Sequence, residues 1–358
     1  MSRVARLLPH NPWARAGLVL VALAGAAAAV YWSGPDWSQV GDAFRAVSWT
    51  WLAVAVVLNL VSVVARSLAW ATVIDQAVPP PHPRLMHVFS AFSIGLLANA
   101  TLPGRVGELA RVAVLTRHMP RLRGAWATLV GTVFAHRAFD FVPAAMLVVW
   151  VLAAAEIPDW AVTSLVILFS IGGVLLAIAF LTARHHQTSH VEGVDTARRF
   201  VTMARHGLGV MRTPMAAVAA ILFQLVGWLC QLFAVWIAMK AFSIDVDLAA
   251  AGLVLVLMNM AAIIPLWPGN VGLLQVAIAT PLVGYGIPYA QGFAFGLGLQ
   301  VIEASVGIGF GLVFLGREGL SFAALRRMPP AVEALEEEDE GEEAVEAEVE
   351  RERASVTT

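Results

Sequence analysis

Three charged residues follow a helix-breaking Pro-Gly pair in an otherwise apolar stretch of the chain. Arg105, Glu108 and Arg111 stand at i, i+3 and i+6 directly behind Pro103-Gly104, a spacing that places them near one helix face. A guanidinium group binds phosphate through paired hydrogen bonds, and the N-terminal end of a helix that restarts after the break attracts anions. We predict that Arg105 and Arg111 bind a lipid phosphate there, beside Gly104 and Gly107, while Glu108 holds the arginines in place.

Further charged residues lie in the apolar runs around this motif. They are Arg66, His136, Arg137, Asp140 and Glu303. Charges inside a membrane are costly, so each is a candidate functional residue by default. Asp140 could help to hold the arginines. Alternatively, Glu108–Arg111 and Arg137–Asp140 could be salt bridges that only hold the bundle together. Arg66 could extend its charged end to the cytoplasmic interface.

The Pro-Gly motif occurs twice in the chain. Residues 102–109 (LPGRVGEL) match residues 267–274 (WPGNVGLL) at five positions, with a constant offset of 268 − 103 = 165. An acidic residue follows each copy in a later apolar run, namely Asp140 and Glu303. The match predicts an internal duplication, although Pro and Gly are also common helix breakers in membranes. The second copy adds four candidate residues: Pro268, Gly269, Asn270 and Gly272.

Apolar runs long enough to cross a bilayer surround both motifs. Crossing about 30 Å of hydrocarbon takes roughly 20 apolar residues in a helix. Such runs cover about 16–33, 50–74, 125–155, 160–182, 214–241 and 289–316. Segments 85–118 and 249–284 are apolar but broken at the two motifs. The sequence therefore predicts an all-α polytopic membrane protein with about six full spans and two broken, re-entrant segments.

Arginines are distributed unevenly among the connecting loops. They gather before residue 16, between 183 and 213, and after 316, whereas the opposite loops are mostly acidic. Because cytoplasmic loops carry the excess of positive charge, we expect both termini in the cytoplasm. Segment 85–118 then enters from the cytoplasm and segment 249–284 from outside, so the two copies are inverted. Inverted repeats with broken helices are typical of secondary transporters.

The last part of the chain differs from the rest. Residues 330–358 are rich in Glu and contain no aromatic side chain, a composition that favours disorder. We predict a transmembrane domain over 1–329 and an acidic, disordered cytoplasmic tail over 330–358. The tail could dock a protein partner.

Composition argues against several function classes. The chain is 59% hydrophobic and 13% charged, unlike a soluble domain. Its single cysteine excludes an internal disulfide, we interpret its histidines as not forming a metal site, and it has no Gly-Lys-Ser/Thr phosphate-binding motif. Only Glu108 and Asp140 could serve as a paired acid and base. We therefore expect no enzyme activity, no metal or other cofactor, and no nucleic-acid partner.

The sequence resembles the lysylphosphatidylglycerol synthase transmembrane-region family, the flippase-like domain of the multiple peptide resistance factor. The resemblance spans about 15–316 and rests on residues 99–111 (NATLPGRVGELAR), 137–140 (RAFD) and 268–272 (PGNVG). It implies a protein of a bacterial or archaeal inner (cytoplasmic) membrane that moves or handles lipids. The aminoacyl-transfer domain of two-domain relatives has no counterpart before the acidic tail, so we do not expect this chain to make lysyl-lipid.

Three positions depart from the family's usual residues. His136 stands where Glu is usual, Gln275 replaces a Glu after the second motif, and Gln300 lies near the place of an arginine. The leading hypothesis is a flippase-like protein that binds and translocates an anionic phospholipid or polyprenyl-phosphate lipid. The lost charges leave an alternative open, a non-transporting membrane subunit that binds a lipid-modifying enzyme or glycosyltransferase. A membrane-embedded enzyme acting on lipid-linked sugars is a third hypothesis.

Overall fold

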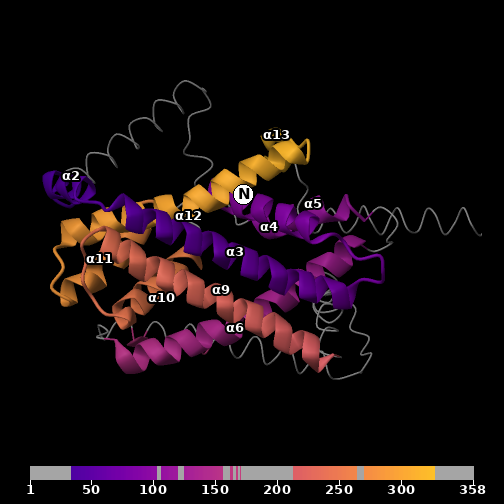
Figure 1. Ribbon diagram of the computed structural model, residues 1–358, viewed down its shortest axis with the longest axis horizontal. Coiled ribbons are helices and arrows are strands. Elements are labelled where there is room, and N and C mark those ends of the chain that lie inside the picture. The colour runs from indigo at the N-terminus through magenta and orange to yellow at the C-terminus, as the bar shows by residue number, and fades with distance from the viewer. Residues whose placement is uncertain are drawn as a thin grey trace, which may run out of the picture.

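The computed structural model describes residues 34–102, 106–119, 125–155, 213–263 and 270–326, together with positions 162, 163, 167 and 170. This part of the chain is all-helical, which confirms the predicted fold class of an all-α polytopic membrane protein (Figure 1). The expected spans at 16–33 and 160–182, the arginine-rich loop and the acidic tail lie outside the described residues.

Four of the described helices are long and apolar enough to cross a bilayer. They are α3 (Trp49–Ala77), α6 (Ala125–Ala154), α9 (Pro214–Ala241) and α12 (Tyr289–Arg317). At about 1.5 Å of rise per residue, each exceeds the roughly 30 Å of a hydrocarbon core. α9 begins on a proline, which suits the first helical turn. α3 ends before a run of prolines because the residue preceding a proline is driven to extended backbone, as Val78 is.

Two pairs of shorter helices are interrupted at the repeated motif. In the first pair, α4 (Leu85–Thr101) is followed by α5 (Gly107–Thr116), and in the second, α10 (Leu248–Ile263) is followed by α11 (Leu273–Gly284). The helices of each pair pack against each other. The predicted breaks in the apolar segments are therefore present, and we call the two pairs the first and second hairpin.

The helix boundaries repeat along the chain. The starts of α3, α4, α5 and α6 at 49, 85, 107 and 125 precede those of α9, α10, α11 and α12 at 214, 248, 273 and 289 by 165, 163, 166 and 164 positions. The packing repeats as well, because α4 contacts α12 as α10 contacts α6, and α5 contacts α6 as α11 contacts α12. Each half of the described bundle thus has the same element order and equivalent neighbours.

Helices α3 and α9 form the longest contact between the halves, and they run antiparallel. The backbone N–H of Ser48 donates to the carbonyl of Ala241, while at the other end Thr213 donates to the Gln76 side chain. Two equivalent helices that meet antiparallel are related by an approximate two-fold axis across their midpoints. The two hairpins accordingly lie toward opposite ends of the long axis (Figure 1).

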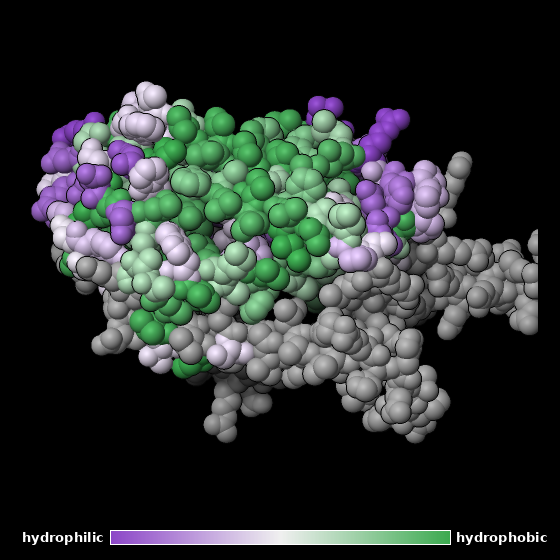
Figure 2. Space-filling view, turned by 60° about the horizontal axis from the view of Figure 1, so that its bottom comes forward, coloured by the Kyte–Doolittle hydropathy of each residue, from purple (hydrophilic) through white to green (hydrophobic). Residues whose placement is uncertain are grey.

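Each hairpin has its own apolar core. One core joins α4 and α5 to the C-terminal halves of α3 and α12, and the other joins α10 and α11 to the C-terminal half of α9 and the first half of α12. On the face shown in Figure 2, hydrophobic residues cover the middle of the molecule and hydrophilic residues gather at its two ends. This belt matches a bundle whose helices cross hydrocarbon.

Two small helices complete the described structure. α2 (Trp37–Arg45) is capped by Asp36, whose carboxylate accepts from the backbone of Ser38 and Gln39. It packs on α12, where Trp37 meets Phe293 edge-to-face. α13 (Phe322–Arg326) follows the last span.

Candidate functional site

The first hairpin closes through a tight contact between glycines. A Cβ added to Gly95 would lie 2.8 Å from the carbonyl oxygen of Gly107, so the two backbones approach more closely than any larger residue allows. The side chain of Asn99 accepts a hydrogen bond from the Gly107 N–H at 2.8 Å, which satisfies one of the free N–H groups at the start of α5. This contact fixes the start of α5 and the charged residues that follow it. Pro103, Gly104 and Arg105 lie outside the described residues.

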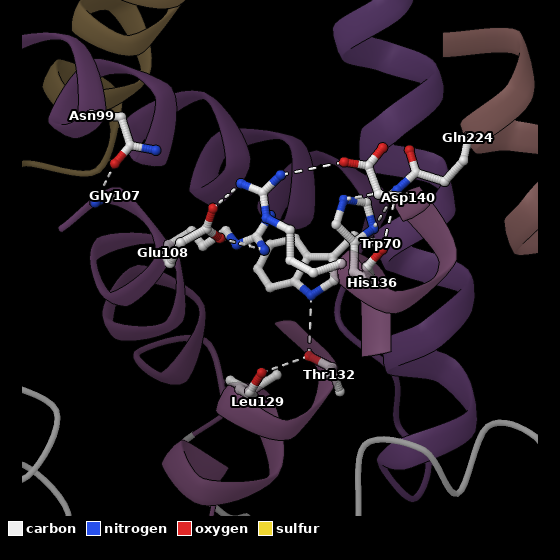
Figure 3. Close-up of polar contacts among 11 residues, drawn as sticks. Trp70, Asn99, Gly107, Glu108, Leu129, Thr132, His136, Asp140 and Gln224 are labelled. Carbon is white, nitrogen blue, oxygen red and sulfur yellow. Dashed lines mark hydrogen bonds and ion pairs between the residues drawn. The ribbon is translucent and has the colours of Figure 1, made fainter. Parts of the chain in front are cut away.

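Glu108 stands between two arginines (Figure 3). Its Oε2 lies 2.6 Å from Nη2 of Arg111 one turn along α5, and its Oε1 accepts a hydrogen bond from Nη2 of Arg137 on α6. Arg137 also donates to Asp140 at 3.4 Å. The two salt bridges expected within helices are therefore both present. The bond between Glu108 and Arg137 joins them across two elements, and spacing along the sequence did not predict it.

Arg111 is enclosed by aromatic rings. Its guanidinium carbon lies 4.6 Å from the ring centre of Trp70 and 5.4 Å from that of Phe92, and only 4% of its side chain is exposed. Trp70 is held in turn by a hydrogen bond of 3.1 Å to the hydroxyl of Thr132. This arrangement suits stacking of a cation on aromatic faces and fits Arg111 to position Glu108 from inside the bundle.

Arg137 is placed differently. It lies near the middle of α6, yet 49% of its side chain is exposed, compared with 27% for Glu108 and 14% for Asp140. An exposed charge at this depth of a spanning helix is unfavourable in hydrocarbon and requires a polar surrounding. Among the three arginines of this network, Arg66, Arg111 and Arg137, Arg137 is the one whose surroundings suit contact with an external anion.

The polar network continues from Asp140 into the second half of the chain. The indole N–H of Trp228 on α9 donates to Asp140 at 2.6 Å, and the guanidinium of Arg66 lies 5.1 Å above the Trp228 ring. Arg66 donates to Gln231 at 2.6 Å, and the Gln231 amide donates to Glu303 at 3.2 Å. Arg66 and Glu303 are thus both brought into the predicted network, and Arg66 points into the bundle.

Sequence reasoning missed the α9 side chains that join the network. Gln224, Trp228 and Gln231 stand at i, i+4 and i+7 of an otherwise apolar helix, which is the spacing of one helix face. Gln224 is fully buried and its amide lies 3.3 Å from a ring nitrogen of His136. A stripe of amide and indole groups on an apolar span was the signal that could have identified them.

The second hairpin contains amides where the first contains charges. Gln275 accepts from the backbone N–H of Gly272 at 2.5 Å and donates to Gln300 at 2.8 Å. Asn270 donates to the carbonyl of Ala261 at 3.2 Å. Gln275 and Gln300, two of the three residues at which the resemblance breaks down, therefore contact each other and form a neutral pair. Pro268 and Gly269 lie outside the described residues.

A smaller polar cluster ties the end of α12 to the first hairpin. Glu318 accepts from the hydroxyl of Ser90 at 2.7 Å and lies 2.8 Å from Nε2 of His118, which stacks on His87. Burial of the carboxylate raises its pKa, but the hydrogen bonds from Ser90 and His118 and the charges of the two histidines outweigh burial and lower the pKa of Glu318. Across the described residues, no group of three or more His, Cys, Asp or Glu side chains is arranged to hold a metal ion.

Comparisons with known proteins agree with the architecture. The profile of the family described as "Lysylphosphatidylglycerol synthase TM region" matches residues 17–311. A curated relative, described as a UPF0104 membrane protein from Methanothermobacter thermautotrophicus, is 22% identical over 284 residues, which cover 71% of this chain and 81% of the relative. No solved structure matches the chain.

Proposed function

We propose that this chain, which belongs to the lysylphosphatidylglycerol synthase transmembrane-region family, binds the phosphate of an anionic membrane lipid and moves the lipid between leaflets. The observation that carries the proposal is the placement of Arg137, whose half-exposed side chain is held by Glu108 and Asp140 near the middle of a spanning helix. A guanidinium group can donate paired hydrogen bonds to a phosphate monoanion.

The repeated architecture supports translocation rather than simple binding. Equivalent helices α3 and α9 meet antiparallel, which is the relation expected of repeats that are inverted across a membrane. We take the two hairpins as re-entrant segments that enter from opposite sides. The charged network runs from α5 of the first hairpin to Glu303 at the middle of α12, and transporters of this kind place their substrate near the middle of the membrane.

The remaining sequence predictions belong to this proposal. Arg105 and the helix start at Gly104 and Gly107 complete the phosphate contact, and Arg111 supports Glu108 from behind. The chain resides in a cytoplasmic membrane with both termini inside, acts without chemical conversion of the lipid, and offers its acidic tail to a protein partner.

A transport assay on the full chain tests the proposal. The purified protein is reconstituted into liposomes with short-chain fluorescent phosphatidylglycerol or polyprenyl phosphate, and the outer-leaflet lipid is extracted with albumin. Arg137→Gln should slow exchange of an anionic lipid by roughly 10- to 100-fold, because hydrogen bonds to a charged group contribute about 1.5–3 kcal/mol. Arg45→Gln is the matched control, because Arg45 is a surface arginine on α2 paired only with Asp42 among the described residues. Equal rates for native protein and Arg137→Gln would contradict the proposal.

One observation favours a second candidate function. Gln275 and Gln300 form a neutral contact, so the second hairpin lacks the charges of the first. A membrane subunit that no longer transports lipid would not need those charges. A folded protein that moves no lipid, but co-purifies with a lipid-modifying enzyme or glycosyltransferase through residues 330–358, would support this function instead.

A further inference from the structure

Glu303 occupies a distinctive position in the polar network. It is the middle residue of α12, a helix that runs from Tyr289 to Arg317, and its carboxylate receives a hydrogen bond from the neutral amide of Gln231 at 3.2 Å. Among the described residues it forms no ion pair within 4.0 Å, whereas Glu108 and Asp140 both pair with Arg137. A carboxylate inside a membrane without a direct countercharge favours its protonated form.

Few other charges surround this carboxylate. Arg66 is linked to it by hydrogen bonds through Gln231 and attracts it electrostatically, without forming an ion pair within 4.0 Å. α11 carries no titratable side chain. The remaining titratable residues on the helices that pack against α12 are Asp42 and Arg45 on α2, Asp75 on α3, His87 on α4, and Cys230 and Lys240 on α9. Apart from the thiol of Cys230, which is neutral near pH 7, these groups lie toward helix ends, away from the middle of α12.

The link from Glu303 to the anion site passes through the junction of the two halves. Arg66 and Gln231 are equivalent residues of the two repeats, since 66 + 165 = 231, and they are hydrogen-bonded to each other. Arg66 also stacks on Trp228, which holds Asp140 beside Arg137. The Nε of Arg66 is buried and has no acceptor among the described residues.

Counted over the described residues alone, which exclude Arg105, the charges of the network balance when Glu303 is ionised. Its described members are three arginines and three carboxylates: Arg66, Arg111, Arg137, Glu108, Asp140 and Glu303. With Glu303 protonated, the network carries one net positive charge, and a phosphodiester monoanion restores neutrality. A neutral loaded site is far easier to carry through hydrocarbon than a charged one.

We propose that Glu303 is a proton-binding site and that one proton binds together with each monoanionic lipid phosphate, so that lipid movement is coupled to a proton gradient. This inference rests on the proposed function and adds its coupling ion. Protonation converts the Glu303 carboxylate to the neutral acid. Glu303 then no longer attracts Arg66, and the three arginines outnumber the two remaining carboxylates when the phosphate binds.

The experiment measures exchange of short-chain fluorescent phosphatidylglycerol between leaflets, detected by extraction with albumin. The labelled lipid is kept at a low fraction of the membrane, and the pH, equal on both sides, is raised in steps from pH 6 to pH 9. Native protein should lose up to about tenfold in rate per pH unit at the alkaline end, because one proton is linked to each bound anion. Glu303→Gln, which imitates the protonated acid, should show no such slope. Glu303→Asp should keep it, and Ser305→Ala, on the same helix but outside the network, should behave like native protein.

A pH dye trapped inside the liposomes provides a second readout. An imposed gradient of anionic lipid should acidify the side that receives the lipid, by one proton per lipid, with native protein but not with Glu303→Gln. If the exchange rate of Glu303→Gln still falls with rising pH, or if the rate depends on sodium instead of pH, the assignment of Glu303 as a proton site is wrong. A flat native profile combined with loss of exchange in Arg137→Gln would overturn only the coupling. No exchange by native protein at any pH would overturn the lipid-transport proposal itself.

Discussion

The two hairpins have the same arrangement of helices and differ in their polar side chains. In both, a glycine stands at the start of the second helix: Gly107 is the first residue of α5, and Gly272 caps α11. A side-chain amide accepts from that glycine's N–H, Asn99 for Gly107 and Gln275 for Gly272. Beyond that glycine the first hairpin places Glu108 between two arginines, whereas the second places Gln275 against Gln300. A duplicated scaffold can therefore keep a hydrogen-bonded start of its second helix while the two copies differ in charge.

The difference in charge between the hairpins affects how each responds to substitution. An amide pair is satisfied by its own hydrogen bonds and remains neutral if it is perturbed. A carboxylate that holds two arginines leaves uncompensated charge when it is removed. The first hairpin should therefore respond strongly to single substitutions, and the second weakly.

The largest contrast is expected at the central polar residue of each hairpin. Glu108→Gln leaves the buried Arg111 without its counterion and should lower the free energy of unfolding by about 3–5 kcal/mol. Gln275→Leu removes hydrogen bonds to Gly272 and Gln300 and should cost about 1–3 kcal/mol. Unfolding of both variants in mixed micelles measures the two losses, and equal losses would remove the energetic distinction between the hairpins.

A smaller contrast is expected at the equivalent glycines. In Gly107→Ala the new methyl group would overlap the carbonyl of Gly95 and lie 2.6 Å from Asn99, so the hairpin must open, at about 3 kcal/mol. In Gly272→Ala the methyl group meets nothing within 4 Å, and the penalty is only the strain of a φ of 95°, about 1–2 kcal/mol. Thermal unfolding of the two variants in one detergent gives the order, and a larger loss for Gly272→Ala would reverse the assignment of the tighter hairpin.

The smallest effect concerns the contact that anchors only the first hairpin to the end of α12. The pKa of Glu318 is lowered in the folded state from its ordinary value of 4.5, so its contribution to stability is present above pH 4.5 and is lost as the pH falls through the folded pKa. Glu318→Gln should therefore reduce the difference in unfolding midpoint between pH 6 and pH 4. An unchanged pH dependence in this variant would show that Ser90 and His118 do not stabilise the carboxylate form.

The positions of the long helices were predicted from hydropathy. Spans expected at 50–74, 125–155, 214–241 and 289–316 appear as helices with boundaries within three residues of those values. The breaks in both short segments were predicted as well, because Pro and Gly act locally on the backbone. The salt bridges Glu108–Arg111 and Arg137–Asp140 followed from helix periodicity, since residues three apart share a face.

Contacts between helices were outside the reach of such reasoning. Nothing in the spacing joins Glu108 to Arg137, or Asp140 to Arg66 through Trp228. Arg105 and Arg111 appeared equivalent candidates from their place on one helix face, and Arg105 remains a prediction because it lies outside the described residues. The burial of Arg111 and the exposure of Arg137 depend on which faces of α5 and α6 pack inward.

The sequence by itself determined that the chain is a bundle of apolar helices, that a motif with an offset of 165 repeats, and that charges accompany the first copy. These properties follow from local chemistry: apolar length, helix breaking and periodicity. Only the tertiary structure decided that the two copies meet antiparallel at α3 and α9, and that their charges form one network ending at Glu303. The reason is physical, since hydrogen bonds and ion pairs between distant segments depend on how helices pack, and the apolar pattern leaves open which neighbours they find.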